Sequence, residues 1–333
     1  MRLKYITLTI ILTGGIMSLA AFSSNEPQKI RSLFNIQQAY CAIKTNDVTG
    51  FDNRKSAWKG RGGGISSTNT LMLVENGENE ISLEIGALGW FSDKSLSPEE
   101  RGHFDPQSAC SLELVRFNGQ EKQMLSSIKV TISPQGLPEA LPDNTRSITR
   151  TKVLAEQATP GHIDPDYFDK TYFPQGMELY RFTQKVTVSG IPEWAWVKAE
   201  PFTGSSEQLQ KLRTAYSEMA RIINSRDRNR LKAYDKTALE AWYATTGDSE
   251  DEILLSQFTK DDLEGGKAIL LPIKWEDYDI RVMNKGRMVR MYNKSKPTYS
   301  PLTYKYTDKN GEEFMGYYAP VFSLIDGKFI PVI

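Results

Sequence analysis

Histidine, the side chain most often used as a general acid or base, occurs only twice in the 333 residues, at His103 and His162. A hydrolytic triad would place one of them beside a nucleophilic serine, which in many hydrolases stands in a Gly-x-Ser-x-Gly turn. The chain contains neither this turn nor the His-Glu-x-x-His pattern of zinc proteases. The sequence therefore predicts no catalytic residues, and we interpret both histidines as surface or loop side chains.

Carboxylates gather directly after His162, where Asp164, Asp166 and Asp169 surround Pro165. Oxygen-rich loops of this kind bind hard cations such as calcium. The segment lacks the central glycine and the closing glutamate of an EF-hand loop, and a solvated turn explains it equally well. We expect no metal and no other cofactor.

Charge is unevenly distributed over the last third of the chain. An acidic stretch, 248–264, is followed by a basic ribbon, 281–296, in which aromatic and methionine side chains are interleaved with the cations. A solvated face accounts for such runs; the functional alternative is a partner surface, because arginine and aromatic residues are enriched at interface hot spots. The candidate partner contacts are Asp248, Glu250, Asp251, Glu252, Asp261 and Asp262 in the acidic stretch, Arg281, Arg287 and Arg290 in the basic ribbon, and Tyr167 and Phe168 in a Pro-rich loop.

The start of the chain has the layout of a secretory signal peptide. Arg2 and Lys4 precede an apolar run, Tyr5–Phe22, and a polar segment follows it. Small side chains at the end of the run favour cleavage near Ser23, so 1–23 is the predicted signal peptide and the mature protein is expected in the periplasm. An uncleaved inner-membrane anchor is the alternative, since the run is about long enough to span a bilayer. No later segment is apolar enough, so we expect no stable membrane span after cleavage.

The predicted export suggests a structural role for the two cysteines of the chain, Cys41 and Cys110. Exported compartments are oxidising, and an even, sparse cysteine count there is typical of one disulfide. A reduced, buried pair is the alternative. Neither a Cys-x-x-Cys pattern nor histidine spacing surrounds the cysteines, so a metal site is not indicated.

Composition excludes further classes of function. Forty-one basic and forty-one acidic residues give a formal net charge of zero. A whole-chain electrostatic case for nucleic-acid binding is therefore missing, and export argues against it as well. The length of 333 residues suits two ordered domains.

The first of these domains is predicted to be a β-sandwich over residues 24–200. Asn79–Ile85 and Ser111–Phe117 alternate apolar and polar side chains, which is the period of a half-buried strand. Short strands separated by Gly, Pro and Asn turns indicate an antiparallel sandwich. Near its end, Trp194 and Trp196 occupy alternate positions of a predicted strand and are expected to be buried on one face.

Helical signals begin beyond Pro201. Ser205 and Gln208 form a candidate capping box before a helix, and Asp227 caps a second helix that ends at Gly247. Tight-turn signals then separate antiparallel strands; they are Asn284-Lys285-Gly286, Asn310-Gly311 and Asp326-Gly327. Residues 201–333 are thus predicted to be an α+β domain, and the fold class of the whole chain is α+β.

Two N-terminal helices, a linker and meandering strands that end in 325–330 (Ile-Asp-Gly-Lys-Phe-Ile) resemble the nuclear-transport-factor-2-like, or SnoaL-like, cone fold. The resemblance covers about residues 205–333. It implies a pocket between the helices and a curved sheet, which members use for catalysis, binding or assembly. Catalytic members place a histidine or an Asp pair there, and this region has no histidine.

The whole chain also resembles a periplasmic immunity protein that neutralises a toxin of a type VI or contact-dependent secretion system. The resemblance implies a protein partner, such as a lipase or peptidoglycan hydrolase, whose active site is occluded. A small-ligand-binding or enzymatic cone domain is the alternative, and a structural envelope protein is a third. A polar pocket with a converging Asp-Tyr or Arg-Tyr pair would favour the alternative, whereas a filled apolar interior would favour the inhibitor.

Overall fold

The computed structural model describes residues 28–142, 147–168, 172–258, 263–265, 267–307 and 310–333. The predicted signal peptide, Asp169, Asp261 and Asp262 lie outside these ranges. No helix in the described ranges is long and apolar enough to cross a membrane.

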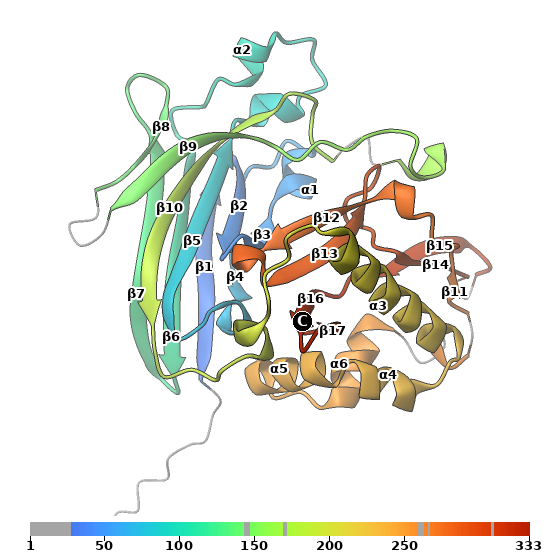
Figure 1. Cartoon of the computed structure of the whole chain (residues 1–333). Coiled ribbons are helices and arrows are strands. Elements are labelled where there is room, and N and C mark those ends of the chain that lie inside the picture. Colours follow the sequence, from blue (N-terminus) through green and yellow to red (C-terminus); the bar gives the residue numbers. More distant parts are fainter. Residues whose placement is uncertain (1–27, 143–146, 169–171, 259–262, 266, 308–309) are drawn as a thin grey trace, which may run out of the picture.

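The described part of the chain is a mixed α+β fold, as the sequence predicts (Figure 1). Its strands are β1 (Lys29–Gln37), β2 (Tyr40–Thr45), β3 (Val48–Asp52), β4 (Gly64–Asn69), β5 (Gly77–Gly86), β6 (Ala109–Asn118), β7 (Glu121–Ile132), β8 (Pro138–Ala140), β9 (Ile148–Leu154), β10 (Glu178–Val188), β11 (Ile269–Leu270), β12 (Tyr278–Met283), β13 (Met288–Asn293), β14 (Leu302–Thr307), β15 (Glu313–Tyr318), β16 (Phe322–Ile325) and β17 (Lys328–Pro331). Its helices are α1 (Arg54–Ala57), α2 (Pro98–Arg101), α3 (Ser206–Asn224), α4 (Arg228–Tyr234), α5 (Lys236–Thr246) and α6 (Glu250–Gln257).

The N-terminal half is a sandwich of two antiparallel sheets, with strand orders β4-β1-β6-β7-β8 and β3-β2-β5-β10-β9. Alternate residues of the strands point inward, so Phe34 and Leu112 from one sheet and Ile43 and Leu83 from the other are buried in a common core. Cys41 on β2 and Cys110 on β6 join the two sheets through a disulfide, which confirms the predicted pair.

The chain leaves the sandwich through a turn, and not through the strand expected around Trp194 and Trp196. Residues 195–198 form a 3-10 turn, so the two indoles do not share one face of a strand. Both are buried, as expected. The indole N–H of Trp194 donates to the carbonyls of Leu71 and Val74, and that of Trp196 donates to Met72. Buried indole donors require acceptors, and the loop before β5 supplies them.

Helix α3 begins where the sequence predicts, with the Ser205 hydroxyl accepting from the backbone N–H of Gln208. The predicted capping box is not closed, because the Gln208 side chain accepts from the Thr203 backbone N–H instead of that of Ser205. Asp227 caps α4 in the predicted way. The expected second helix is, however, divided at Asp235 into α4 and α5, and Gly247 ends α5 in the left-handed conformation with φ 79°. The acidic stretch then contributes α6.

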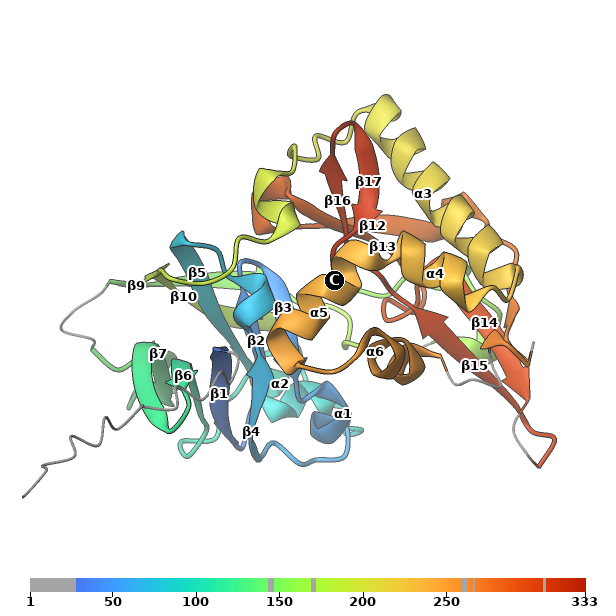
Figure 2. The same ribbon diagram turned by 90° about the horizontal axis from the view of Figure 1, so that it is seen from below.

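Two antiparallel sheets complete the C-terminal half, with strand orders β12-β13-β16-β17 and β11-β14-β15. Figure 2 shows α3 lying along the first of these sheets. Val289 and Met291 of β13 belong to the core that α3 covers, whereas Met288 belongs to the core of the sandwich. Because side chains alternate along a strand, β13 presents Met288, Arg290 and Tyr292 to the sandwich side.

Contacts between the two halves are numerous. The amide of Asn284, in the β12–β13 turn, donates to the carbonyl of Asn46 at 2.9 Å. Arg287 donates to the Glu75 carboxylate at 2.8 Å, and both side chains are largely buried. The segment after β9 crosses to the other half, where the Thr159 amide donates to the carbonyl of Lys294.

Candidate ligand-binding cleft

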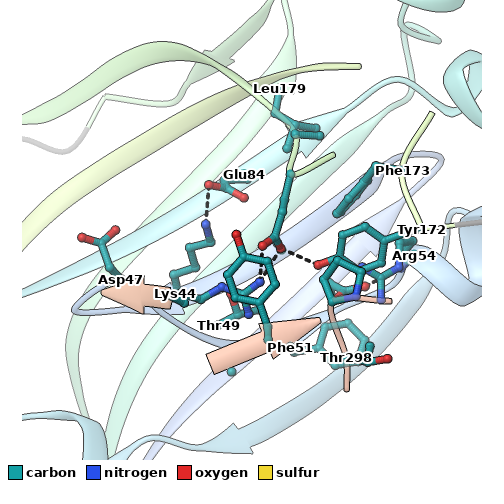
Figure 3. Close-up of a pocket in the computed structure, with 18 of the residues that line it drawn as sticks. Lys44, Asp47, Thr49, Phe51, Arg54, Glu84, Tyr172, Phe173, Leu179 and Thr298 are labelled. Atoms are coloured by element: carbon teal, nitrogen blue, oxygen red, sulfur yellow. Dashed lines mark hydrogen bonds and ion pairs between the residues drawn. The ribbon is translucent and has the colours of Figure 1, made fainter. Parts of the chain in front are cut away.

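A cavity of about 710 Å³ lies between the second sheet of the sandwich and the β12–β13 hairpin (Figure 3). Its lining comes from β2, β3, β5 and β10 on one side and from β12 and β13 on the other. The segment after β9 and the loop that holds Tyr172 and Phe173 complete it. The cleft is therefore assembled from residues that are more than 200 positions apart.

The alternation of side chains along the strands explains why the sandwich side of the cleft is charged. Inward residues of β2, β5 and β10 build the sandwich core, so Lys44, Glu84 and Arg181 point outward into the cleft. Glu84 and Arg181 are direct cross-strand partners, and their side chains form an ion pair of 2.7 Å. Lys44 binds the same carboxylate at 2.8 Å, as Figure 3 shows. At this end of the cleft, the charges of Lys44 and Arg181 are thus paired with the carboxylate of Glu84.

The opposite wall holds a hydrogen-bonded network around Glu156. Its carboxylate accepts from the Tyr172 hydroxyl and from the guanidinium of Arg281. Arg281 also lies 4.7 Å from the centroid of the Tyr292 ring, in a cation–π contact. Burial raises the pKa of the Tyr172 hydroxyl, so it remains a hydrogen-bond donor at neutral pH.

Two further arginines lie beside this network. Arg54 is only 8% exposed, and its guanidinium carbon lies 4.0 Å from the centroid of the Tyr172 ring and 5.0 Å from that of Phe173. Arg290 stands directly opposite Arg281 in the β12–β13 register, and its buried Nε atom has no acceptor among the described residues. Burial, reinforced by Arg281, lowers the pKa of Arg290. Within the described ranges neither Arg54 nor Arg290 forms an ion pair.

The chemistry available in the cleft is ion pairing, hydrogen bonding and stacking. Five cations and four carboxylates line it, together with the rings of Tyr40, Tyr172, Phe173 and Tyr292. Guanidinium groups and aromatic faces are well suited to hold a planar or anionic molecule.

The structure places the basic-ribbon candidates at the contact between the halves. Arg281 and Arg290 line the cleft. Arg287 binds Glu75 and lies 5.1 Å from the ring of Trp196. The hydrogen bond from Arg287 lowers the pKa of Glu75. Arg281 and Arg287 are therefore paired with carboxylates of the N-terminal half, and the three partly buried arginines do not form one solvated face.

The acidic candidates lie on and before α6. Asp251 forms an ion pair with Arg228 at 3.0 Å and another with Lys232. Glu252 belongs to a capping box with Ser249. Asp248 and Glu250 are exposed. Two of the four described carboxylates thus stabilise α6 and its contact with α4.

Tyr167 and Phe168 are half-buried in a 3-10 turn that Asp164 caps. His162, at the start of this loop, binds Asp277 through Nδ1 at 3.0 Å. Among the described residues, no group of three or more His, Cys, Asp or Glu side chains could hold a metal ion.

The interior between α3 and its sheet, where the cone resemblance implies a pocket, contains a closely packed apolar cluster. Leu212, Tyr216 and Met219 of α3 pack there with Phe322 and Phe329. An Asp-Tyr pair lies in the same half, but it is buried: the Tyr318 hydroxyl donates to Asp235 at 3.0 Å. Within the described part of the chain the second carboxylate oxygen of Asp235 has no partner, and burial raises the pKa of Asp235 to about 7.

Sequence reasoning missed Arg54, Glu156 and Tyr172 as site residues. Arg54 follows a short strand without a recognisable motif, and Glu156 precedes an irregular loop. The one local signal was the adjacent aromatic pair Tyr172-Phe173, because aromatic residues on a loop need a contact to bury them.

No protein-family model matches the chain, and a search of curated proteins finds no match to it either.

Proposed function

We propose that this protein is an exported binding protein that holds a small polar ligand in the cleft between its two halves. The observation that carries the proposal is the guanidinium of Arg54, which is nearly buried, stacked on Tyr172 and without an ion-pair partner in the described ranges. Ligand pockets commonly combine aromatic walls with a few polar groups that fix orientation, and several hundred Å³ is their usual volume.

Export rests on the signal-peptide pattern of residues 2–22, which directs the mature chain to the periplasm. The disulfide is consistent with that oxidising compartment. A cleft between two packed parts of a protein is also a common position for a ligand site.

Filling the cleft tests this function. Thr49 is exposed and lines the cleft, so Thr49→Trp should obstruct it without entering a core. Thr151, which is exposed on β9 and outside the cleft lining, provides the matched control Thr151→Trp. Each protein is incubated with a periplasmic extract and repurified, and the retained small molecules are identified by mass spectrometry. We expect a compound on the wild type and the control that Thr49→Trp lacks. Identical profiles for all three proteins would reject the proposal.

The filled interior of the C-terminal half favours a second candidate, the immunity protein that occludes a toxin such as a lipase or peptidoglycan hydrolase. In that role the exposed carboxylates beside α6 are the candidate contacts, because Asp251 and Glu252 already have internal partners. The test is co-expression with candidate effectors, lipases and peptidoglycan hydrolases, directed to the periplasm. Asp248→Lys/Glu250→Lys should reduce protection, whereas Glu193→Lys, an exposed change outside α6, should preserve it. Equal protection by both variants would remove α6 from the interface.

A further inference from the structure

Three guanidinium groups converge on one side of the cleft; Arg54, Arg281 and Arg290 are named here the arginine subsite. Arg281 and Arg290 are direct cross-strand partners on β12 and β13. Arg54 reaches them from the sandwich through the ring of Tyr172, whose hydroxyl binds the same Glu156 carboxylate as Arg281. Like charges placed directly opposite each other on a sheet repel, so this arrangement requires a compensating anion.

The protein supplies one such anion. Glu156 binds Arg281, and within the described ranges no carboxylate pairs with Arg54 or Arg290. Glu84, the other well-buried carboxylate of the cleft, is occupied by Lys44 and Arg181. Asp52, another carboxylate of the lining, accepts a hydrogen bond from the backbone amide of Arg54 and forms no ion pair within the described ranges. Among the described residues, the three guanidinium groups therefore have one ion-paired carboxylate, that of Glu156.

The excess of positive charge in the arginine subsite matters because the guanidinium groups are largely buried. An uncompensated cation away from water is costly, and stacking on Tyr172 and Phe173 offsets only part of that cost. A guanidinium presents parallel donors that match the two oxygens of a carboxylate or phosphate. Arg54 lines the cavity, and among the described residues no acceptor binds its guanidinium or the buried Nε of Arg290.

We propose that the arginine subsite binds the oxyanion group, a carboxylate or a phosphate, of a small-molecule ligand. Glu156 occupies part of the subsite before the ligand enters. This inference rests on the proposed function, since it assigns one end of the ligand to one end of the same cleft. The satisfied end around Glu84 would then contact the uncharged remainder of the molecule.

The test uses inorganic phosphate and succinate as separate probes, titrated calorimetrically at constant ionic strength into the full mature protein. The wild type should bind at least one probe, which also distinguishes the phosphate from the carboxylate source. Arg54→Gln should weaken that binding about tenfold or more, which is the scale of a lost charged hydrogen bond. Lys198→Gln, an exposed cation outside the cleft, should leave it unchanged.

A gain-of-affinity variant makes the test independent of any loss of folding. Glu156→Gln removes the carboxylate that pairs with Arg281 while keeping the size of the side chain, so the same probe should bind several-fold more tightly. Unchanged affinity in both Arg54→Gln and Glu156→Gln, or no binding to wild type and Glu156→Gln, overturns the arginine subsite. If Thr49→Trp abolishes retention of an extract compound that Arg54→Gln still retains, the binding function stands and this inference alone fails.

Discussion

Asp235 is a single buried residue whose charged form destabilises the folded protein. The side chain sits between α4 and α5, almost wholly buried, with one oxygen bound by Tyr318 and the other unpaired. The charged form is disfavoured there because a low-dielectric interior solvates a carboxylate poorly. The carboxyl therefore holds a proton in the folded protein at pH values where the unfolded chain has released it.

The pH dependence of stability follows from this difference. Burial raises the pKa of Asp235 from 3.8 to about 7, so the folded state binds the additional proton between these values. Stability should consequently fall as pH rises from about 4 to 7, by on the order of 4 kcal/mol at most. Asp235→Asn should flatten that part of the profile and raise the free energy of unfolding at pH 8. Urea unfolding at pH 5 and pH 8 measures both effects, with the exposed Asp248→Asn as control. Parallel profiles for Asp235→Asn and wild type would contradict the prediction.

Elements that depend on local chemistry were predictable from sequence, and elements that depend on packing were not. Ser205, Asp227 and Gly247 act at helix ends through their own side chain or backbone conformation, and each lies where it was expected. The interruption at Asp235 carries no such signal. The turn after Trp194 also has no local signal, and the contact made beside it is tertiary: the Trp194 indole donates to carbonyls of the loop before β5.

The N-terminal cap of α3 provides a test at this scale. The Ser205 hydroxyl accepts from the Gln208 amide at 3.2 Å. Ser205→Ala should therefore lower the free energy of unfolding by about 1 kcal/mol. Ser206→Ala, one position further and exposed, should change it by less than about 0.5 kcal/mol. The two variants are compared by urea denaturation, and equal losses would show that the cap does not stabilise the helix.

For the whole molecule, the candidate site could not be predicted because it belongs to no single segment. The basic ribbon was visible in the sequence, yet only the packing of β12–β13 against β2 and β5 brings Arg281 toward Tyr172 and Arg54. Sequence patterns show only which residues are close along the chain. The residues that line the cleft are far apart in the sequence and come from both halves of the molecule.

The ion pair between Arg287 and Glu75 should make the contact between those halves costly to break. Both side chains are about 14% exposed or less, and Trp196 lies against the guanidinium. Arg287→Met leaves Glu75 without its main partner and should destabilise the protein by about 3–5 kcal/mol at pH 7. The exposed pair Lys185–Glu78 is the control, and Lys185→Gln should leave the stability nearly unchanged because exposed ion pairs contribute little. Comparable losses in urea for the two variants would contradict this assignment.

The disulfide should stabilise the sandwich through the length of chain that it closes. Cys41 and Cys110 are 69 residues apart, for which the chain-entropy relation gives about 4 kcal/mol as an upper value. Cys41→Ala/Cys110→Ala should lower the urea midpoint, and a reducing agent should then have no further effect. Denatured wild type, alkylated without reduction, should show no free thiol. Two labelled thiols, or an unchanged midpoint, would argue against a stabilising bridge.

That bridge also sets an order of events during biosynthesis. A chain that crosses a membrane from its N-terminus delivers Cys110 long before Arg281 and Arg290 emerge. The disulfide can therefore form while the second wall of the cleft is still untranslated or untranslocated. Met283, Met288 and Val332 belong to the same apolar core as the sandwich strands, so that core is complete only when the last strands of the chain have arrived.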